Sequence, residues 1–367
     1  MTKRLKFPAK SAFFKTLKQR VDQYFAETGT HKYANTAMWV KIVIFLSGFL
    51  ICYGFIISSI TSNFFMMILA IFLGIFSAFV GFNICHDALH GAISSNKYVN
   101  KAFGMVFNLL GASPYIWAIS HNGVHHTFTN IPGHDDDLIV APGIIRIESN
   151  DPIKRVQQYQ HWYAFPLYGL ASLSWAFRKD FKKIFQRKIG QISVKHPIKE
   201  YFKLFGFKSL YYFLFIVLPL LVLNITWWQF LIGFVAMHLA QGFTMGLVFQ
   251  LAHVIEDTNF PQAASNGNME DAWAEHQMLT TANFASNSRI AAFLLGGLNR
   301  QIEHHLFPGI CHIHYAKLGA IVKQTANEFG LPYIESPTFF TAMRSHYRVL
   351  KKFATEAKSL QSVEQVA

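Results

Sequence analysis

Four long apolar segments constrain the fold of this chain more than any other feature. A helix needs about 20 residues to cross the apolar core of a bilayer, and segments of this kind occupy residues 40–60, 64–84, 210–227 and 230–251. The link inside each pair is only long enough for a turn, so each pair should form a helical hairpin. The sequence therefore predicts an all-α integral membrane protein with four transmembrane helices in two hairpins.

The positive charges predict how these helices are oriented. The net charge is +13, and Lys and Arg gather before the first apolar segment, between the hairpins and after the last segment, whereas both hairpin turns contain none. Since cytoplasmic loops carry most Lys and Arg, we expect both termini to be cytoplasmic, in a bacterial inner membrane or the endoplasmic reticulum. The charge indicates attraction to an anionic membrane surface rather than to nucleic acid.

Together these features predict one membrane domain over residues 1–367. Residues 1–39 form a basic cytoplasmic lead-in, which we expect to lie on the bilayer surface as an amphipathic segment. Residues 85–209 and 252–367 form a helical cytoplasmic cap. A fifth apolar stretch, residues 102–119, is interrupted by Gly and Pro, so we expect it to be interfacial or re-entrant rather than a full span.

Histidines cluster at the cytoplasmic ends of the predicted helices. They occur in three motifs, HDALH, HNGVHH and QIEHH, and one more ends the fourth apolar segment. The eight residues are His86, His90, His121, His125, His126, His253, His304 and His305. Because the charges independently assign all of them to one side of the membrane, we predict that they form a metal site.

Helical spacing predicts how these residues share the metal. His86 and His90 are four residues apart, so their rings lie on one helix face and can bind one ion. His121 and His125 repeat this spacing. His126 points about 100° away from its neighbour, toward a second ion.

The number of ligands predicts more than one ion. Eight imidazoles exceed what one ion accepts, and neutral imidazole suits iron, zinc, copper and nickel. We therefore expect two transition-metal ions with open coordination positions, although spacing alone does not name the metal. Gln301, three residues before His304 and on the same helix face, is a candidate further ligand.

Acidic residues near the motifs are candidates for orienting the ligands. A histidine that binds a metal usually donates its other N–H to a carboxylate or a carbonyl. The acids nearest in sequence are Asp87, Glu256, Asp257 and Glu303. The sequence does not assign a particular acid to a particular histidine.

Other histidines carry other predictions. His238 lies within the fourth apolar segment, too far along the helix from His253 to share an ion, and we expect it to line a cavity. His134 should lie in an acidic surface turn, GHDDDL. The remaining histidines are expected to be structural, solvated or hydrogen-bonded: His31, His161, His196, His276, His312, His314 and His346.

The three motifs, in this order, resemble the histidine boxes of membrane fatty acid desaturases. The patterns H-D-x-x-H, H-N-x-x-H-H and Q-x-x-H-H, with the surrounding GGLNRQIEHHLFP, are similar to the branch of front-end acyl-lipid or acyl-CoA desaturases and sphingolipid desaturases. The resemblance covers about residues 40–335. It implies a di-iron centre held by the eight histidines, with Gln301 where other branches have a histidine.

The resemblance also implies the reaction and its partners. The enzyme would use O2 to insert a double bond into an acyl chain carried by coenzyme A, acyl carrier protein or a lipid. Many front-end relatives contain a fused haem domain, and the short N-terminal segment predicts none here. We therefore expect electrons to come from a separate donor, either a ferredoxin or a cytochrome b-type protein.

Two other functions fit part of the pattern. An acyl or sphingoid hydroxylase could use the same metal centre, because a small shift of substrate relative to the oxidant changes the product. A membrane metal transporter would place histidines and acids along several helices near the middle of the bilayer. Of the histidines, only His238 has that position, so transport is the more distant alternative.

Overall fold

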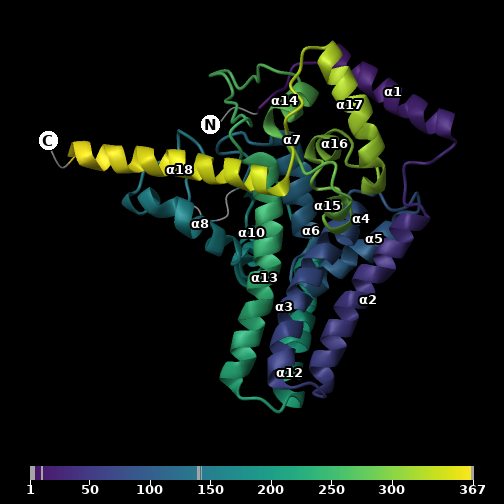
Figure 1. The fold of residues 1–367 in the computed structure, drawn as a ribbon, viewed down its shortest axis with the longest axis vertical. Helices are drawn as coiled ribbons and strands as arrows, with labels where there is room; N and C mark the ends of the chain where they lie inside the picture. The colour runs from purple at the N-terminus through teal and green to yellow at the C-terminus, as the bar shows by residue number, and fades with distance from the viewer. Residues whose placement is uncertain (1–4, 10, 139–140, 142, 365–367) are drawn as a thin grey trace.

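The computed structural model describes residues 5–9, 11–138, 141 and 143–364. Residues 1–4 and 10 of the expected lead-in, residues 139, 140 and 142 of the cap, and the last three residues lie outside this range. Most of the chain is helical, and the long helices form a bundle that projects from a larger assembly of shorter helices (Figure 1). The described part contains four helical stretches long and apolar enough to cross a membrane.

These four stretches correspond to the four predicted segments. The first is α2 (Thr36–Ser58), and the fourth is α13 (Trp227–His253). The second joins α3 (Asn63–Val80), η1 (Gly81–Cys85) and α4 (His86–Leu89), and the third joins α11 (Ile198–Tyr212), η6 (Phe213–Val217) and α12 (Leu218–Val222).

The third stretch differs most from its expected bounds of 210–227, since it begins at Ile198 and ends at Val222. Capping explains the earlier end. The Thr226 hydroxyl accepts a hydrogen bond from the backbone N–H of Gln229, whose side chain accepts one from the backbone N–H of Thr226. This reciprocal pair starts α13 at Trp227.

Helix α3 packs between α2 and α13 in the bundle (Figure 1). A glycine allows the closest approach, since a Cβ at Gly74 would lie 2.1 Å from the carbonyl oxygen of Met237 on α13. Any larger residue there would force the two helices apart. The packing brings α4, which continues α3 and begins at His86, to the same end of the bundle as His253 at the end of α13.

The remaining elements gather at that end, opposite the two hairpin turns (Figure 1). In the first half of the chain they are α1 (Ala12–Thr28), α5 (Lys97–Met105), η2 (Val106–Leu110), α6 (Pro114–Trp117), η3 (Ala118–His125), α7 (His126–Phe128), η4 (Arg155–Tyr159), α8 (Gln160–Tyr168), α9 (Ala171–Ser174), η5 (Trp175–Lys179) and α10 (Asp180–Ile184). Those that follow α13 are α14 (Trp273–Thr280), α15 (Arg289–Leu294), α16 (Gln301–Leu306), η7 (His312–His314), α17 (Tyr315–Glu328) and α18 (Phe339–Glu364).

Strands contribute little to the architecture. Strands β1 (Lys188–Ile189) and β2 (Ile192–Ser193) pair antiparallel, and β3 (Asn283–Phe284) pairs parallel with β4 (Glu335–Ser336). The interrupted stretch is bent, because the helical segments Lys97–Leu110 and Pro114–Phe128 meet at 108°. This bend fits the expected re-entrant or interfacial segment, although a broken span has the same form.

The lead-in helix packs against the cap. The apolar face of α1, formed by Phe13, Leu17 and Val21, is buried against α17 and α14 rather than left free for a bilayer. At the edge of this contact, Arg20 donates hydrogen bonds to Thr325 and Glu328 of α17. The face is therefore covered by protein, a contact that the periodicity of the segment alone does not distinguish from membrane binding.

Candidate metal centre

The first histidine group forms where the second membrane stretch ends. There α3 passes through the π-helical turn η1 into α4. The rings of His86 and His90 have centroids 4.7 Å apart. His121 of η3 and His304 of α16 complete the group, and one possible ligand atom from each of the four lies within 4.8 Å of the others.

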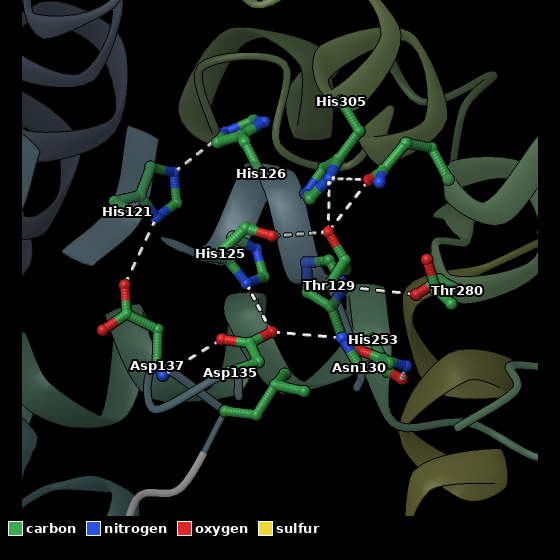
Figure 2. Close-up of polar contacts among 12 residues, drawn as sticks. His121, His125, His126, Thr129, Asn130, Asp135, Asp137, His253, Thr280 and His305 are labelled. Carbon is green, nitrogen blue, oxygen red and sulfur yellow. Dashed lines mark hydrogen bonds and ion pairs between the residues drawn. The ribbon is translucent and has the colours of Figure 1, made fainter. Parts of the chain in front are cut away.

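A second group lies beside the first. It combines His125 of η3, His253 at the end of α13 and His305 of α16, again with possible ligand atoms within 4.8 Å of one another. His126 forms an overlapping set with His304 and His305, so it lies between the two groups. Figure 2 shows rings from these separate segments converging on one space.

The chemistry of the site fits metal ions. Among the described side chains, both ring nitrogens of His86 and the Nε2 atoms of His90, His125 and His304 are buried without a hydrogen-bond partner. Such atoms are costly unless something binds them. Two nitrogens bound at about 2.1 Å to one ion can be at most about 4.2 Å apart, so each group needs only a small contraction.

Five of the clustered histidines outside the membrane stretches are held in the neutral form that binds metals. Burial lowers the pKa of His90, His126, His304 and His305 well below the usual value. Burial likewise lowers the pKa of His121 to about 3, although Asp137 opposes the shift. Neutral imidazole keeps a lone pair for a metal.

The second motif does not follow α-helical spacing. His121 joins the first group and His125 the second, although their stacked rings have centroids 5.0 Å apart, so the grouping favours different ions for a pair that was expected to share one. The physical reason is that residues 118–125 form a π-helix, whose i→i+5 hydrogen bonds place more residues in each turn. His121 accordingly contacts His126, five residues later, with 3.2 Å between their Nε2 atoms (Figure 2).

Gln301 lies inside the second group rather than beside His304. Its Nε2 is 3.0 Å from His253 Nε2 and 3.3 Å from His305 Nε2, while its Oε1 is buried without a partner in the described residues. In an α-helix a residue lies nearly as close to i+4 as to i+3, and here the tertiary contact with His253 selects His305.

The four predicted acids differ in position. Asp87 is buried, and its Oδ1 is 3.9 Å from His86 Nδ1. The buried carboxylate of Glu303 instead accepts hydrogen bonds from Tyr333 and Asn283, and burial raises its pKa to about 7.

The other two acids point away from the histidines. Glu256 and Asp257 are exposed, and Glu256 contacts Ser345 and Arg348 of α18. The chain leaves the helix after His253, at Val254, and carries both acids to the surface. The prediction that these two acids orient the ligands is therefore wrong.

Two acids that orient the histidines were missed. His125 Nδ1 donates to Asp135 Oδ2 at 2.8 Å, and His121 Nδ1 lies 3.6 Å from Asp137 Oδ2 (Figure 2). Burial alone would raise the pKa of Asp137, but the positive charges of Lys179 and Lys183 hold it well below its usual range. Both acids lie in the GHDDDL turn that was assigned to the surface. Three acids directly after a histidine motif were the available signal.

Amide, hydroxyl and carbonyl groups contact three more of the clustered histidines. His305 Nδ1 donates to Gln277 Oε1 at 2.7 Å, and His253 Nδ1 lies 3.3 Å from the Thr280 carbonyl oxygen (Figure 2). His304 Nδ1 lies 3.3 Å from the Tyr315 hydroxyl. These contacts all use Nδ1, so Nε2 is the ring nitrogen that each histidine would offer to a metal.

His238 differs from its prediction. It is fully buried, and its ring nitrogens lie 2.9 Å from Ser172 Oγ and 2.9 Å from Tyr211 OH. These bonds satisfy the ring between α13 and α11 and explain its depth in the helix without a cavity. His276 and His346 are hydrogen-bonded and buried, as in the structural interpretation.

A cavity of about 300 Å³ opens beside the first group. His86, His121 and Gln301 line its inner part, and exposed Arg178 and Lys182 line its outer part. Apolar side chains form much of the wall, among them Phe82, Phe107, Trp117, Met245, Phe249 and Leu298. The cavity can therefore hold an apolar chain next to the histidines, with its polar end near two cations.

Comparison with known proteins identifies the family. The fatty acid desaturase family model matches residues 62–337. The chain is 36% identical to an acyl-lipid (8-3)-desaturase of Physcomitrium patens over 93% of this chain and 71% of the relative. It is also 36% identical to an sn-1 linoleoyl-lipid 6-desaturase of Synechocystis sp., over 95% of this chain and 97% of the relative.

A third relative extends over the whole chain. An sn-1 linoleoyl-lipid 6-desaturase of Arthrospira platensis is 32% identical over 100% of this chain and 98% of its own length. These names agree with the front-end branch that the third motif predicted. The chain therefore belongs to the fatty acid desaturase family, and it is an oxidoreductase of that family.

Proposed function

We propose that this protein is an O2-dependent acyl-lipid desaturase with a di-iron centre. The observation that carries the proposal is the pair of adjacent, buried histidine groups at the inner part of an apolar cavity. The relatives are named for acyl-lipid substrates, which favours a lipid-bound acyl chain over a coenzyme A or acyl carrier protein thioester.

The eight histidines would hold the two ions. His86, His90, His121 and His304 would bind one, and His125, His253 and His305 the other, with His126 placed to reach either. When bound, iron with O2 and two electrons supplies the oxidant needed to remove hydrogen from an unactivated chain. In the balanced reaction, –CH2–CH2–, O2, two electrons and two protons give –CH=CH– and two water molecules.

Gln301 would be a further ligand of the second ion. A half-turn of its side-chain amide exchanges Nε2 and Oε1, which have similar shape. The exchanged oxygen would then lie beside His253 and His305, where the amide nitrogen now contacts both rings. In the exchanged orientation the metal would bind Gln301 Oε1, which otherwise stays buried without a partner among the described residues.

The cavity walls would position the substrate. Phe107, Trp117 and Phe249 exclude water from the acyl chain and hold one carbon pair next to the ions. Trp117 also stacks on His121, with ring centroids 4.2 Å apart. Arg178 and Lys182 would face the polar head of the lipid, which stays at the membrane surface.

The proposed topology places the histidines on the cytoplasmic side, with both termini. It is supported by the Lys and Arg distribution, since the hairpin turns without positive charge lie at the end of the bundle opposite α1 and α18 (Figure 1). A separate ferredoxin or cytochrome b-type protein would approach the cap from that side.

The test is a reconstitution with a defined lipid. Purified protein in nanodiscs is loaded with ferrous iron and given a reductant, an electron donor and an acyl lipid, and the products are measured by mass spectrometry. The expected result is about two irons per chain and O2-dependent loss of two hydrogens from the acyl chain. Gain of one oxygen would assign a hydroxylase instead, and activity without iron would refute the proposal.

A further inference from the structure

A lysine is buried in a membrane helix that provides none of the clustered histidines. Lys41 of α2 is 7% exposed, and its Nζ lies 2.8 Å from His312 Nε2 and donates to the Ala292 carbonyl oxygen at 3.3 Å. A charged side chain in a membrane-spanning segment is costly and usually serves a function. These contacts connect the first membrane helix to α15, which precedes the third histidine motif, and to η7, which follows it.

The donor properties of the ammonium fix the direction of the hydrogen bonds. An ammonium group only donates, so His312 Nε2 must accept and the ring proton must be on Nδ1. His312 Nδ1 then donates to Asp87 Oδ2 at 2.9 Å, and the backbone N–H of His312 donates to the same oxygen at 3.1 Å. A neutral ring thus joins a buried cation to a buried anion.

The anion faces a histidine of the first group. Asp87 Oδ1 lies 3.9 Å from His86 Nδ1, a nitrogen that has no hydrogen-bond partner elsewhere in the described chain. Because Oδ2 already accepts two hydrogen bonds from His312, the carboxylate cannot rotate without losing them. The arrangement keeps Oδ1 directed at His86, where a metal-binding histidine needs an acceptor.

Lys41 also argues against a separate metal site at its contact residues. Asp87, Cys311 and His312 lie close enough together to suggest another metal site. The ammonium supplies the positive charge that their carboxylate requires, and both ring nitrogens of His312 already have hydrogen-bond partners, Lys41 at Nε2 and Asp87 at Nδ1. The three residues therefore support the first histidine group and do not form a separate centre.

We propose that Lys41 is a positioning residue of the metal centre, acting through His312 and Asp87 on His86. The inference rests on the proposed function, since it requires His86 to bind iron. Lys41 itself touches neither the ion nor the substrate.

The test compares two buried lysines in the full-length protein in nanodiscs. Lys41→Met removes the proposed positioning contact. Lys208→Met is the matched control, because Lys208 is also in a membrane helix, is 4% exposed, and donates to the Gly111 and Trp175 carbonyl oxygens beside Asp180 rather than toward the histidines. Lys41→Arg tests whether another cationic side chain at this position is enough to retain iron.

Each variant is loaded anaerobically with ferrous iron, and iron release to a chelator is followed together with the Mössbauer spectrum and the melting temperature. Loss of a group that orients a ligand typically weakens metal binding 10–100-fold, so Lys41→Met should release iron about tenfold faster, with one of two iron signals altered. Lys208→Met should lower the melting temperature with iron release near the wild-type rate, and Lys41→Arg should restore most of the retention.

Three outcomes would overturn the inference. Wild-type iron release in Lys41→Met would remove the link to His86. Equal acceleration in Lys41→Met and Lys208→Met, at equal loss of melting temperature, would reduce Lys41 to a structural role. A wild-type protein that binds no iron would overturn both this inference and the proposed function, whereas the first two results leave the proposed function standing.

Discussion

Asp135→Asn should weaken metal binding although Asp135 is outside the three histidine motifs. Asp135 is 5% exposed, and its Oδ2 accepts hydrogen bonds from His125 Nδ1 at 2.8 Å and from the backbone N–H of Asn130 at 3.1 Å. Its Oδ1 accepts a third, from the backbone N–H of Asp137 at 3.1 Å. The substitution keeps the shape of the side chain but replaces one accepting oxygen by a donating NH2.

The magnitude follows from this count of donors. If the amide oxygen takes the place of Oδ2, its NH2 faces the N–H of Asp137. In the opposite orientation it faces the ring N–H of His125. In either case a buried donor loses its acceptor, at about 1–3 kcal/mol, and the charge that fixed the His125 tautomer is lost. At about 1.4 kcal/mol per tenfold, we expect iron affinity and activity to fall about 10–100-fold.

The assay measures iron per chain after dialysis against a chelator, and the rate of double-bond formation by gas chromatography of the acyl products. Asp257→Asn is the matched control, because it makes the same change four residues after His253 at an exposed position. The control should retain iron and activity. Equal effects of the two substitutions, or full iron retention in Asp135→Asn, would refute the assignment of Asp135 to His125.

Three further predictions concern other parts of the molecule. His305→Ala removes a ligand of the second group and should lower iron-dependent activity on the order of 100-fold or more, with unchanged circular dichroism; retained product formation would show that the third motif is misassigned. Burial lowers the pKa of His346 from 6.5 to about 4, so between these pH values the unfolded chain binds a proton that the folded chain does not. Stability should therefore fall as pH drops from 6.5 to 4, by roughly 3 kcal/mol at most. His346→Gln should reduce this pH dependence in melting curves, and an identical decline in the variant would contradict the assignment to His346. Arg178→Gln at the outer cavity should raise KM for an anionic phospholipid substrate about two- to fivefold with kcat unchanged, since an exposed ion contact contributes about 0.2–1 kcal/mol. The control is Arg187→Gln, because Arg187 is exposed on the same segment and is not among the residues lining the cavity. The control should leave KM unchanged, and equal changes in KM would exclude a specific contact at Arg178.

Local patterns in the sequence were enough to predict the membrane helices and the eight clustered histidines. A segment of about 20 apolar residues must be helical in a bilayer, whatever its neighbours are, because its backbone groups find no other partners there. The spacing of His86 and His90 likewise needed only the geometry of one helical turn. Both expectations agree with the structure because they depend on contacts within a few residues.

The division of histidines between the groups depended on tertiary structure. A π-helix carries both His121 and His125, and it places His121 in the first group and His125 in the second although their ring centroids are 5.0 Å apart. Proximity in sequence was also a poor guide to the acids, because Glu256 and Asp257 follow a helix end that turns them to the surface.

The sequence by itself determined the class of protein, since apolar length and the ordered histidine motifs are local properties. Only the tertiary structure decided how the site is supported. Gln301 meets His253 across 48 residues, and His312 meets Asp87 across 225. Such pairs form because a buried donor requires an acceptor and the packed helices bring one within reach. This requirement depends on distance in the folded protein and not on distance along the chain. The motifs therefore predicted which residues would bind metal, whereas the packing of the helices determined which groups orient them.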